Sequence, residues 1–422
     1  MHRIVLILLI VSTTLLGQSA NNRVAKMQED FSYLQALKFI ESDYDRWVEE
    51  LIELTEIPAP PFKEEARARV YLQKLSELGL QNVEMDLVGN VMGLRTGAGT
   101  GGPLLAVAAH LDTVFPEGTD VEVQRNGTRL SAPGIGDDTA GLATLLAVIR
   151  AFDASNILTL SDILFIGNVG EEGPGDLRGM KYLFLEGPYK DKIKLFVAVE
   201  GGRQADITNA ALGSKRYRIT FKGPGGHSFS AFGLVNPAFA MANAMKKFSE
   251  LQVPSDPRTT FNVGIVGGGT SVNSIPADTW MDVDLRSEDP EELDALAETF
   301  LGLMHEAVEE ENSIRSTAEG SLRLEIKMIG DRPSGEVSVE SSIVQLATAA
   351  YRSFGIEPIY SRSSTDANIP ISLGIPGITI DRGGLGGRSH SLDEWTDVRR
   401  AETVKGIQVV LTTILAIAGL QE

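Results

Sequence analysis

The chain has 422 residues, 43% of them hydrophobic, which is enough to build the cores of two domains. Its formal net charge of −19 argues against nucleic acid or an anionic membrane surface as a partner. The chain contains no cysteine, which excludes thiol nucleophiles, disulfides and thiolate metal ligands, so any metal must be held by histidine and carboxylate.

The first 20 residues predict a secretory signal peptide. A short basic start precedes an apolar run over residues 4–16, and small residues up to Ala20 supply a cleavage site. The run is shorter than the ~20 apolar residues of a membrane span, so an uncleaved anchor is the less favoured alternative. We therefore expect an exported protein, periplasmic or secreted, with no stable membrane insertion.

The next segments predict two helices and a hairpin. Apolar residues recur at helical spacing over 30–54 and 64–78, with the proline-rich stretch 57–61 between them. The hairpin covers 83–94. The uncharged run 104–109 then predicts a strand buried on both faces of a parallel sheet.

The strand over 104–109 ends at His110, and Asp112 follows two positions later. Ligands of open α/β sheets bind outside the carboxyl ends of strands, so a site is expected here. The alternative is a strand that ends in ordinary polar residues.

Two adjacent aspartates, Asp137 and Asp138, precede a predicted helix over 142–152. Such a pair can serve only to cap the helix and oppose its dipole. We favour a functional interpretation because the glycines before the pair permit a tight turn that places one carboxylate outside the helix.

Two further apolar strands end in acids. The strand over 162–169 leads to Glu171 and Glu172, and the strand over 194–199 closes on Glu200. A solvated charge run is the alternative for the glutamate pair. Carboxyl ends of parallel strands share one edge of a sheet, which favours a common site.

The pattern changes at residue 211. A half-exposed strand leads into the glycine-rich turn 223–227, which ends at His227, and the following elements complete a β-α-β-β-α-β order. This predicts an inserted α+β, ferredoxin-like domain over 211–330. The domain that carries the candidate site, expected to be the catalytic one, is thereby split into 21–210 and 331–422.

Histidine is scarce, with five residues in the chain. His390 lies in a glycine-rich loop, 383–391, that has no evident packing role. An ordinary surface histidine is the alternative.

In this order the motifs resemble the dinuclear zinc metallopeptidase family of glutamate carboxypeptidase, peptidase T, aminoacylase, acetylornithine deacetylase and succinyl-diaminopimelate desuccinylase. The matching motifs are H-x-D-T-V at 110–114, G-x-x-D-D at 134–138, E-E at 171–172, the glycine-rich turn with His227, and the late His390. The resemblance covers the whole mature chain. It implies an α/β, zinc-exopeptidase-like catalytic domain with a mixed, largely parallel sheet, and an inserted α+β lid or dimerisation domain.

The resemblance also implies a ligand set for two Zn²⁺ ions, with Mn²⁺ or Co²⁺ as substitutes. His110 and Glu200 would hold one ion, Glu172 and His390 the other, and Asp137 would bridge both. Imidazole and carboxylate are ligands that suit zinc.

Further roles follow from the resemblance. Glu171 matches the general base, Asp112 the partner that orients His110, and His227 a donor that stabilises the oxyanion, often from the partner subunit of a dimer. Asn273, Arg286 and Thr365 match substrate-binding positions. For Arg286 a structural ion pair with Asp282 or Asp284 is equally expected.

The expected activity is metal-dependent, exopeptidase-like hydrolysis of an amide bond in small peptides. In the family, glutamate at the position of Glu200 tends to accompany deacylases, so an N-acyl amino acid deacylase is the close alternative. The secretory start points the other way, because the biosynthetic deacylases of the family are cytoplasmic, and an exported hydrolase is better placed to trim peptides or N-acyl amino acids for uptake. The alternative from a different class of function is a non-catalytic protein that binds metal or peptide. A homodimer formed through the insert is the assembly that the resemblance suggests, and the sequence alone leaves it open.

Overall fold

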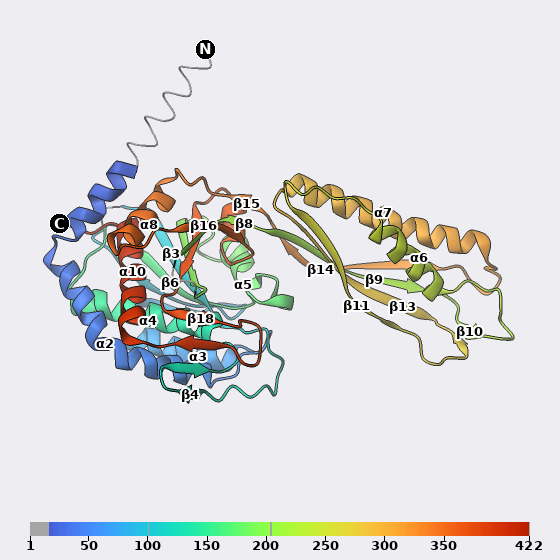
Figure 1. Cartoon of the computed structure of the whole chain (residues 1–422), viewed down its shortest axis with the longest axis horizontal. Coiled ribbons are helices and arrows are strands. Elements are labelled where there is room, and N and C mark those ends of the chain that lie inside the picture. Colours follow the sequence, from blue (N-terminus) through green and yellow to red (C-terminus); the bar gives the residue numbers. More distant parts are fainter. Residues whose placement is uncertain (1–16, 100, 203–204, 422) are drawn as a thin grey trace, which may run out of the picture. The chain divides into compact units, whose positions relative to one another are not determined.

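The computed structural model describes residues 17–99, 101–202 and 205–421 (Figure 1). The predicted signal peptide lies mostly outside the described residues. Residues 17–27 are helical, and Ala20, Val24 and Met27 are buried. The chain divides into unit 1, Met1–Ala211 with Glu336–Glu422, and unit 2, Leu212–Gly335. The insert predicted over 211–330 corresponds to unit 2.

Unit 1 is built on one nine-stranded sheet. Its strands β6, β3, β7 and β17 are parallel neighbours, whereas β2 pairs antiparallel with β6 and β17 pairs antiparallel with β8. This mixed, largely parallel sheet confirms the predicted α/β class. The order is β1 (Gln81–Met85), β2 (Val91–Arg95), β6 (Ile163–Asn168), β3 (Leu104–His110), β7 (Ile193–Glu200), β17 (Gly377–Asp381), β8 (Asp206–Ala211) and β15 (Gly335–Glu336), with β16 (Ile359–Ser363) beside β8.

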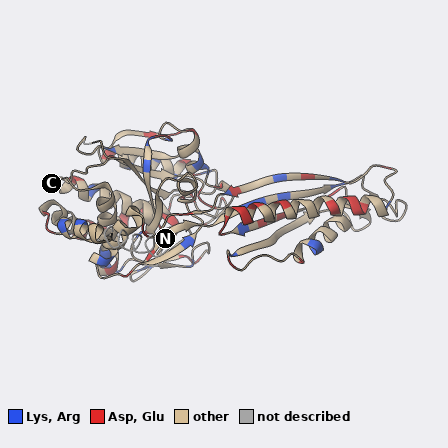
Figure 2. Cartoon of the chain, turned by 90° about the horizontal axis from the view of Figure 1, so that it is seen from above, with Lys and Arg blue, Asp and Glu red and all other residues tan. Residues whose placement is uncertain are grey.

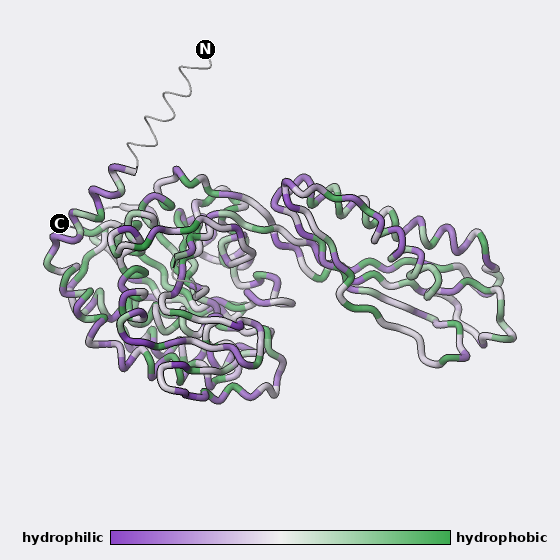
Figure 3. The backbone as a smooth tube through the Cα atoms, viewed as in Figure 1, coloured by the Kyte–Doolittle hydropathy of each residue, from purple (hydrophilic) through white to green (hydrophobic). Residues whose placement is uncertain are grey.

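Strand β3 is buried on both faces, as its uncharged sequence predicts. Leu105 and Val107 belong to one core, and Ala106 and Ala108 to the other. This alternation is the geometry of an extended strand. Figure 3 shows hydrophobic backbone segments running through the interior of unit 1. The first core is formed with α2 (Phe31–Thr55), α3 (Glu65–Glu77), α4 (Ala140–Ala154), α8 (Ser342–Ser353) and α10 (Arg400–Ala418), and the second with α5 (Arg178–Lys181) and α9 (Asn368–Ser372).

Helix α10 is long and apolar enough to cross a membrane by length and composition alone. It packs instead as a core helix of unit 1, where 78% of its apolar window is buried.

A small antiparallel sheet in unit 1 joins distant parts of the chain. It runs in the order β18 (Leu385–Gly387), β19 (Trp395–Asp397), β5 (Arg129–Ser131) and β4 (Gln124–Asn126). Trp395 pairs with Ser131 in this sheet. The pairing brings the loop that carries His390 beside the turn that carries Asp137.

Unit 2 has the predicted β-α-β-β-α-β order. This order is made by β9 (Gly213–Lys222), α6 (Pro237–Ser249), β11 (Thr259–Gly268), β13 (Asp278–Ser287), α7 (Pro290–Ile314) and β14 (Arg323–Arg332), and the antiparallel sheet runs β11-β13-β9-β14.

One face of the sheet in unit 2 packs against its helices, and the other carries charges. Ile219 and Phe221 are buried in the core that the sheet shares with α6 and α7. Alternate residues of the same strands form ion pairs, of which Arg218–Asp282 is one. Figure 2 shows Lys and Arg residues along the strands of this unit. Asp289 caps the first turn of α7 by accepting two backbone N–H groups, which explains why that helix begins there.

Candidate metal centre

Three neighbouring parallel strands of unit 1 deliver candidate residues to one edge of the sheet. His110 closes β3 and pairs with Asn168, the last residue of β6. Glu171 and Glu172 lie just beyond the end of β6, after Val169 and Gly170, and Glu200 is the last residue of β7, on the other side of β3. The edge that the sequence predicts is therefore where these side chains lie.

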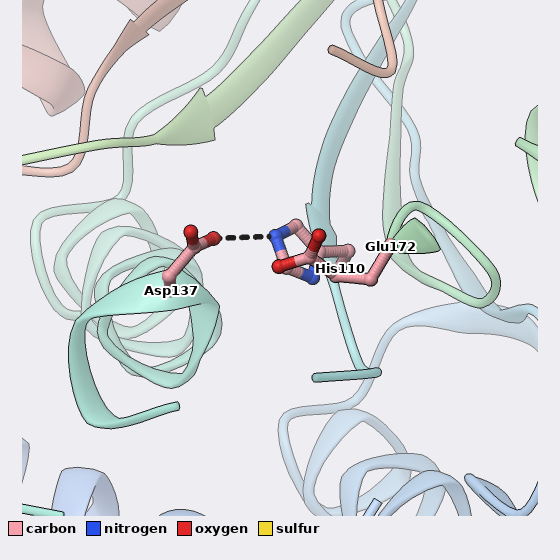
Figure 4. A group of neighbouring side chains, drawn as sticks. All are labelled: His110, Asp137 and Glu172. Atoms are coloured by element: carbon pink, nitrogen blue, oxygen red, sulfur yellow. Dashed lines mark hydrogen bonds and ion pairs between the residues drawn. The ribbon is translucent and has the colours of Figure 1, made fainter. Parts of the chain in front are cut away.

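The imidazole of His110 is buried between two acceptors. Its Nε2 lies 2.9 Å from Asp137 Oδ1 (Figure 4). Its Nδ1 lies 3.0 Å from the backbone carbonyl oxygen of Asp112. A carbonyl can only accept, so Nδ1 carries the hydrogen and Nε2 is the nitrogen that can bind a metal.

The carboxylate of Asp112 has a different task from the one expected. Its Oδ1 lies 3.9 Å from His110 Nδ1, too far for a hydrogen bond. Instead Oδ1 accepts the backbone N–H of Glu171 at 3.1 Å, and Oδ2 accepts that of Glu172 at 2.8 Å. Asp112 thus holds His110 through its backbone and the glutamate pair through its side chain.

Asp137 lies between two imidazoles that are far apart in sequence. Its Oδ1 faces His110 Nε2 at 2.9 Å, and its Oδ2 faces His390 Nε2 at 3.3 Å. The same His390 nitrogen lies 3.0 Å from Glu172 Oε1. Ligand atoms of His110, Asp137 and Glu172 all lie within 4.8 Å of one another.

The adjacent aspartates Asp137 and Asp138 have different contacts. Gly134 has φ 77°, which only glycine adopts readily, and the turn that follows presents Asp137 outside α4. Asp138 is buried, and its Oδ2 accepts the backbone N–H of His110 at 3.2 Å. A Cβ at Gly141 would lie 2.4 Å from Asp138 Oδ1, so glycine is needed there as well.

A cavity of about 660 Å³ in unit 1 opens onto this cluster. Asp137, Glu200 and His390 line it together with Thr365. The side chain of Thr365 is buried, and its hydroxyl lies 2.8 Å from the hydroxyl of Thr379. Thr365 therefore forms part of the cavity wall.

The pKa values of two acids in the cluster are raised strongly. Burial raises the pKa of Glu172 to about 7; the hydrogen bond with His390 opposes this rise, and the charges of Asp137 and Glu171 add to it. Burial, followed by the charge of Glu171, raises the pKa of Glu200 well above its ordinary value. The cluster is thus short of positive charge.

The pKa values of the two imidazoles are also raised, which favours their positively charged form. Burial acts to lower the pKa of His110, but its hydrogen bond with Asp137 and the nearby carboxylates raise it well above its ordinary value. Hydrogen bonds with Asp137 and Glu172 raise the pKa of His390 to about 10. An environment that favours positive charge on nitrogen also favours a divalent cation, and imidazole with carboxylate is a donor set that fits zinc.

Two of the predicted residues in unit 2 lie together. His227 pairs with Ser274 between β10 (Gly226–His227) and β12 (Ser274–Ile275), and Ser228 N–H donates to the carbonyl of Asn273 at 2.9 Å. The Nδ1 of His227 accepts the backbone N–H of Phe229 at 3.2 Å.

Arg286 lies elsewhere in unit 2. It is eight positions along β13 from Asp278, about 26 Å of extended strand. Its Nε donates to Asp284 Oδ2 at 2.7 Å. The geometry therefore matches the structural ion pair, the alternative given for Arg286.

The role of Glu394 was not predicted from the sequence. It is buried, and its carboxylate accepts three backbone N–H groups of the Gly134–Asp137 turn. The only signal in the sequence is its position four residues after His390.

Comparison with known proteins agrees with this geometry. Residues 106–416 match the model of the peptidase family M20/M25/M40. The chain is 27% identical to the uncharacterised protein YqjE of Bacillus subtilis (strain 168), over 79% of this chain and 89% of that protein. It is 23% identical to carboxypeptidase G2 of Pseudomonas sp. (strain RS-16), over 66% and 68% of the two chains.

The fold is shared with solved structures. The crystal structure of aminopeptidase PepT from Bacillus cereus superimposes with a TM-score of 0.71 at 23% identity, covering 89% of this chain and 99% of that one. The chain therefore belongs to the peptidase family M20/M25/M40 and is a metal-dependent peptide or amide hydrolase.

Proposed function

We propose that the chain holds two divalent metal ions, with zinc as the native metal and Mn²⁺ or Co²⁺ as substitutes. The observation that carries this proposal is the position of Asp137, whose two oxygens face the Nε2 atoms of two different histidines. His110 and Glu200 would hold one ion, and Glu172 and His390 the other. Asp137 would be shared.

The general base in this proposal is Glu171. When bound, the metal ions lower the pKa of a water molecule and polarise the scissile carbonyl. The carboxylate of Glu171 takes a proton from the attacking water and delivers it to the leaving amine, a contribution of ~10²–10⁴-fold to the rate. Asp112 supports this role because it fixes the backbone of Glu171.

The oxyanion donor in this proposal is His227. Because its Nδ1 accepts the N–H of Phe229, its Nε2 carries the hydrogen in the neutral ring and is free to donate. Such a donor is worth ~10²–10³-fold in rate. Asn273, which lies beside this loop, is proposed to bind a substrate carboxylate.

The substrate class in this proposal is small peptides, cleaved from one end. The cavity of about 660 Å³ is of the size that takes a small molecule. One relative is named a carboxypeptidase and a structural neighbour an aminopeptidase, so the assay must include peptides with a free amino terminus and peptides with a free carboxyl terminus. Hydrolysis of N-acyl amino acids is the second candidate, favoured by glutamate at position 200.

We further propose that the chain is exported after cleavage near Ala20 and forms a homodimer through unit 2. The edge strand β11 supports the dimer, because Ile265 and Val266 on it are exposed. Mass determination of the exported protein and its sedimentation at several concentrations test these two points. A mature chain that keeps residues 1–20, or a monomer at all concentrations, would contradict them.

The test of the activity is hydrolysis of a panel of dipeptides, tripeptides and N-acyl amino acids with free and blocked termini. We expect activity that chelation abolishes and added zinc restores. Glu171→Gln is expected to lose ~10²–10⁴-fold in kcat and to keep its metal. Hydrolysis that survives both treatments would refute the mechanism, and inactivity on the whole panel with metal bound would favour the non-catalytic binding protein.

A further inference from the structure

The carboxylate of Glu394 is enclosed by the turn that presents Asp137. Its Oε1 lies 2.8 Å from the backbone nitrogens of both Gly136 and Asp137, and its Oε2 lies 3.1 Å from that of Gly134. The side chain is only 1% exposed. Buried backbone N–H groups need acceptors, and a carboxylate is the strongest that a side chain offers.

The turn has the shape that this contact requires. A Cβ at Gly136 would lie 2.9 Å from Glu394 Oε1, which is closer than packed atoms tolerate, and 3.1 Å from Arg382 Nη2, which is a tight contact. Arg382 is buried, donates to Thr396 Oγ1 at 3.1 Å, and supplies a positive charge near Glu394.

The same loop supplies both His390 and Glu394. Glu394 is also held by its backbone, because its carbonyl accepts the N–H of Ala132 at 3.1 Å where β19 pairs with β5. One segment therefore delivers a candidate ligand and, four residues later, the acceptor that fixes the shared ligand Asp137.

We propose that Glu394 is a positioning residue of the metal centre. Its oxygens are occupied by three backbone N–H groups and bind no metal themselves. By fixing the backbone of Asp137, they keep its two carboxylate oxygens directed at His110 and His390. This inference rests on the proposed function, since it concerns the same pair of metal ions.

Glu394→Gln tests the inference because it keeps the volume of the side chain and replaces one acceptor oxygen with an NH₂ group. That group faces backbone donors, so the turn must move. Outer-shell partners of metal ligands typically contribute 10–100-fold to metal affinity. We expect zinc to bind the full-length variant ~10–100-fold more weakly in competition with a chromogenic chelator, and the visible spectrum of the Co²⁺ form to change.

Gly136→Ala is the second variant, which leaves the charge of Glu394 in place. Its added Cβ should displace the carboxylate, so zinc affinity and the Co²⁺ spectrum should change in the same direction as in Glu394→Gln. If Glu394→Gln does not fold, the zinc affinity and the Co²⁺ spectrum of Gly136→Ala test the inference in its place.

The matched control is Glu50→Gln. Glu50 is a buried glutamate of unit 1 whose Oε2 accepts from Arg150 Nη1 at 2.8 Å, with no contact to the metal centre. This variant should lower the thermal unfolding temperature and leave zinc affinity within about twofold of wild type.

Three outcomes are informative. Unchanged zinc affinity and Co²⁺ spectrum in both Glu394→Gln and Gly136→Ala would overturn this inference alone, because wild-type metal binding and hydrolysis would remain. An equal loss of affinity in Glu50→Gln would overturn it too, since instability would then be the cause. A wild-type chain that binds no zinc would overturn it together with the proposed function.

Discussion

The carboxylate of Asp112 accepts the backbone N–H of Glu172 at 2.8 Å. The other oxygen of the same carboxylate accepts the N–H of the preceding glutamate, so one buried acid fixes both a candidate ligand and the candidate base. The backbone carbonyl of Asp112 also holds His110 Nδ1. Asp112 therefore connects the carboxyl ends of β3 and β6 into one site.

Asp112→Asn should lower kcat by ~10–100-fold, with little change in KM for a small peptide. The amide keeps one acceptor and turns a donor towards the second backbone N–H, which displaces the glutamate pair. Steady-state kinetics measure the effect. Asp162→Asn is the control, because Asp162 Oδ1 likewise accepts a backbone N–H, from Gly97, at the opposite end of β6. Equal kinetics in wild type and Asp112→Asn would contradict the prediction.

Asp137→Asn should abolish the binding of both metal ions, whereas Glu172→Gln should weaken the binding of only one ion. The two oxygens of Asp137 face His110 and His390, but Glu172 contacts only His390 among these imidazoles. Metal content after dialysis, measured by elemental analysis, distinguishes the two variants. Equal stoichiometry in both would argue against a shared carboxylate.

Breaking a buried ion triad should destabilise unit 1 strongly. Arg150 donates to Asp43 Oδ2 at 2.6 Å and to Glu50 Oε2 at 2.8 Å, and all three side chains are buried. Arg150→Met leaves the buried Asp43 without its ion-pair partner and Glu50 with Arg46 alone, and should cost about 3–5 kcal/mol. Removing the exposed pair of Lys63 and Glu117 with Lys63→Met should cost about 0–1 kcal/mol. Urea unfolding followed by a probe in unit 1 measures both, and similar costs would contradict the prediction.

The stability of the metal-free protein should fall as pH rises from about 4 to about 8. Burial, followed by the charge of Glu171, raises the pKa of Asp366 to about 8, against about 4 in an unfolded chain. Between these values the folded state holds a proton that the unfolded state has lost, so stability decreases with pH.

Asp366→Asn tests this pH dependence because it removes the titrating group and leaves a polar side chain beside Asn168, which donates to Asp366 Oδ2 at 2.7 Å. Thermal unfolding in chelator at pH 5 and pH 8 should show a smaller difference in the variant than in wild type. The same difference in both would assign the pH dependence to other groups.

The parts of the site that follow strand ends could be predicted from the sequence. His110, Glu172 and Glu200 come together because β6, β3 and β7 are parallel neighbours, and a buried parallel strand is visible as an uncharged run. The order of elements in the insert could also be predicted, because its first strand has a half-exposed pattern and the elements after it complete a β-α-β-β-α-β order.

Other contacts could not be predicted. Glu394 is 257 residues from Asp137, and its role depends on the pairing of β19 with β5, for which three-residue strands leave no pattern. The contact of Asp112 with the glutamate pair depends on side-chain direction just beyond the end of β3, where the alternation of the strand no longer applies. The choice of Asp284 as the partner of Arg286 is likewise decided by side-chain conformation on one face of β13.

The most direct test of the account is anomalous diffraction from crystals grown with excess zinc, with data collected on both sides of the zinc absorption edge. We predict two anomalous peaks about 3.5–4 Å apart, one on each side of Asp137, with His110 Nε2 bound to one and His390 Nε2 to the other. No peak at Asp137, or a single peak that leaves one of these histidines unbound, would contradict the account.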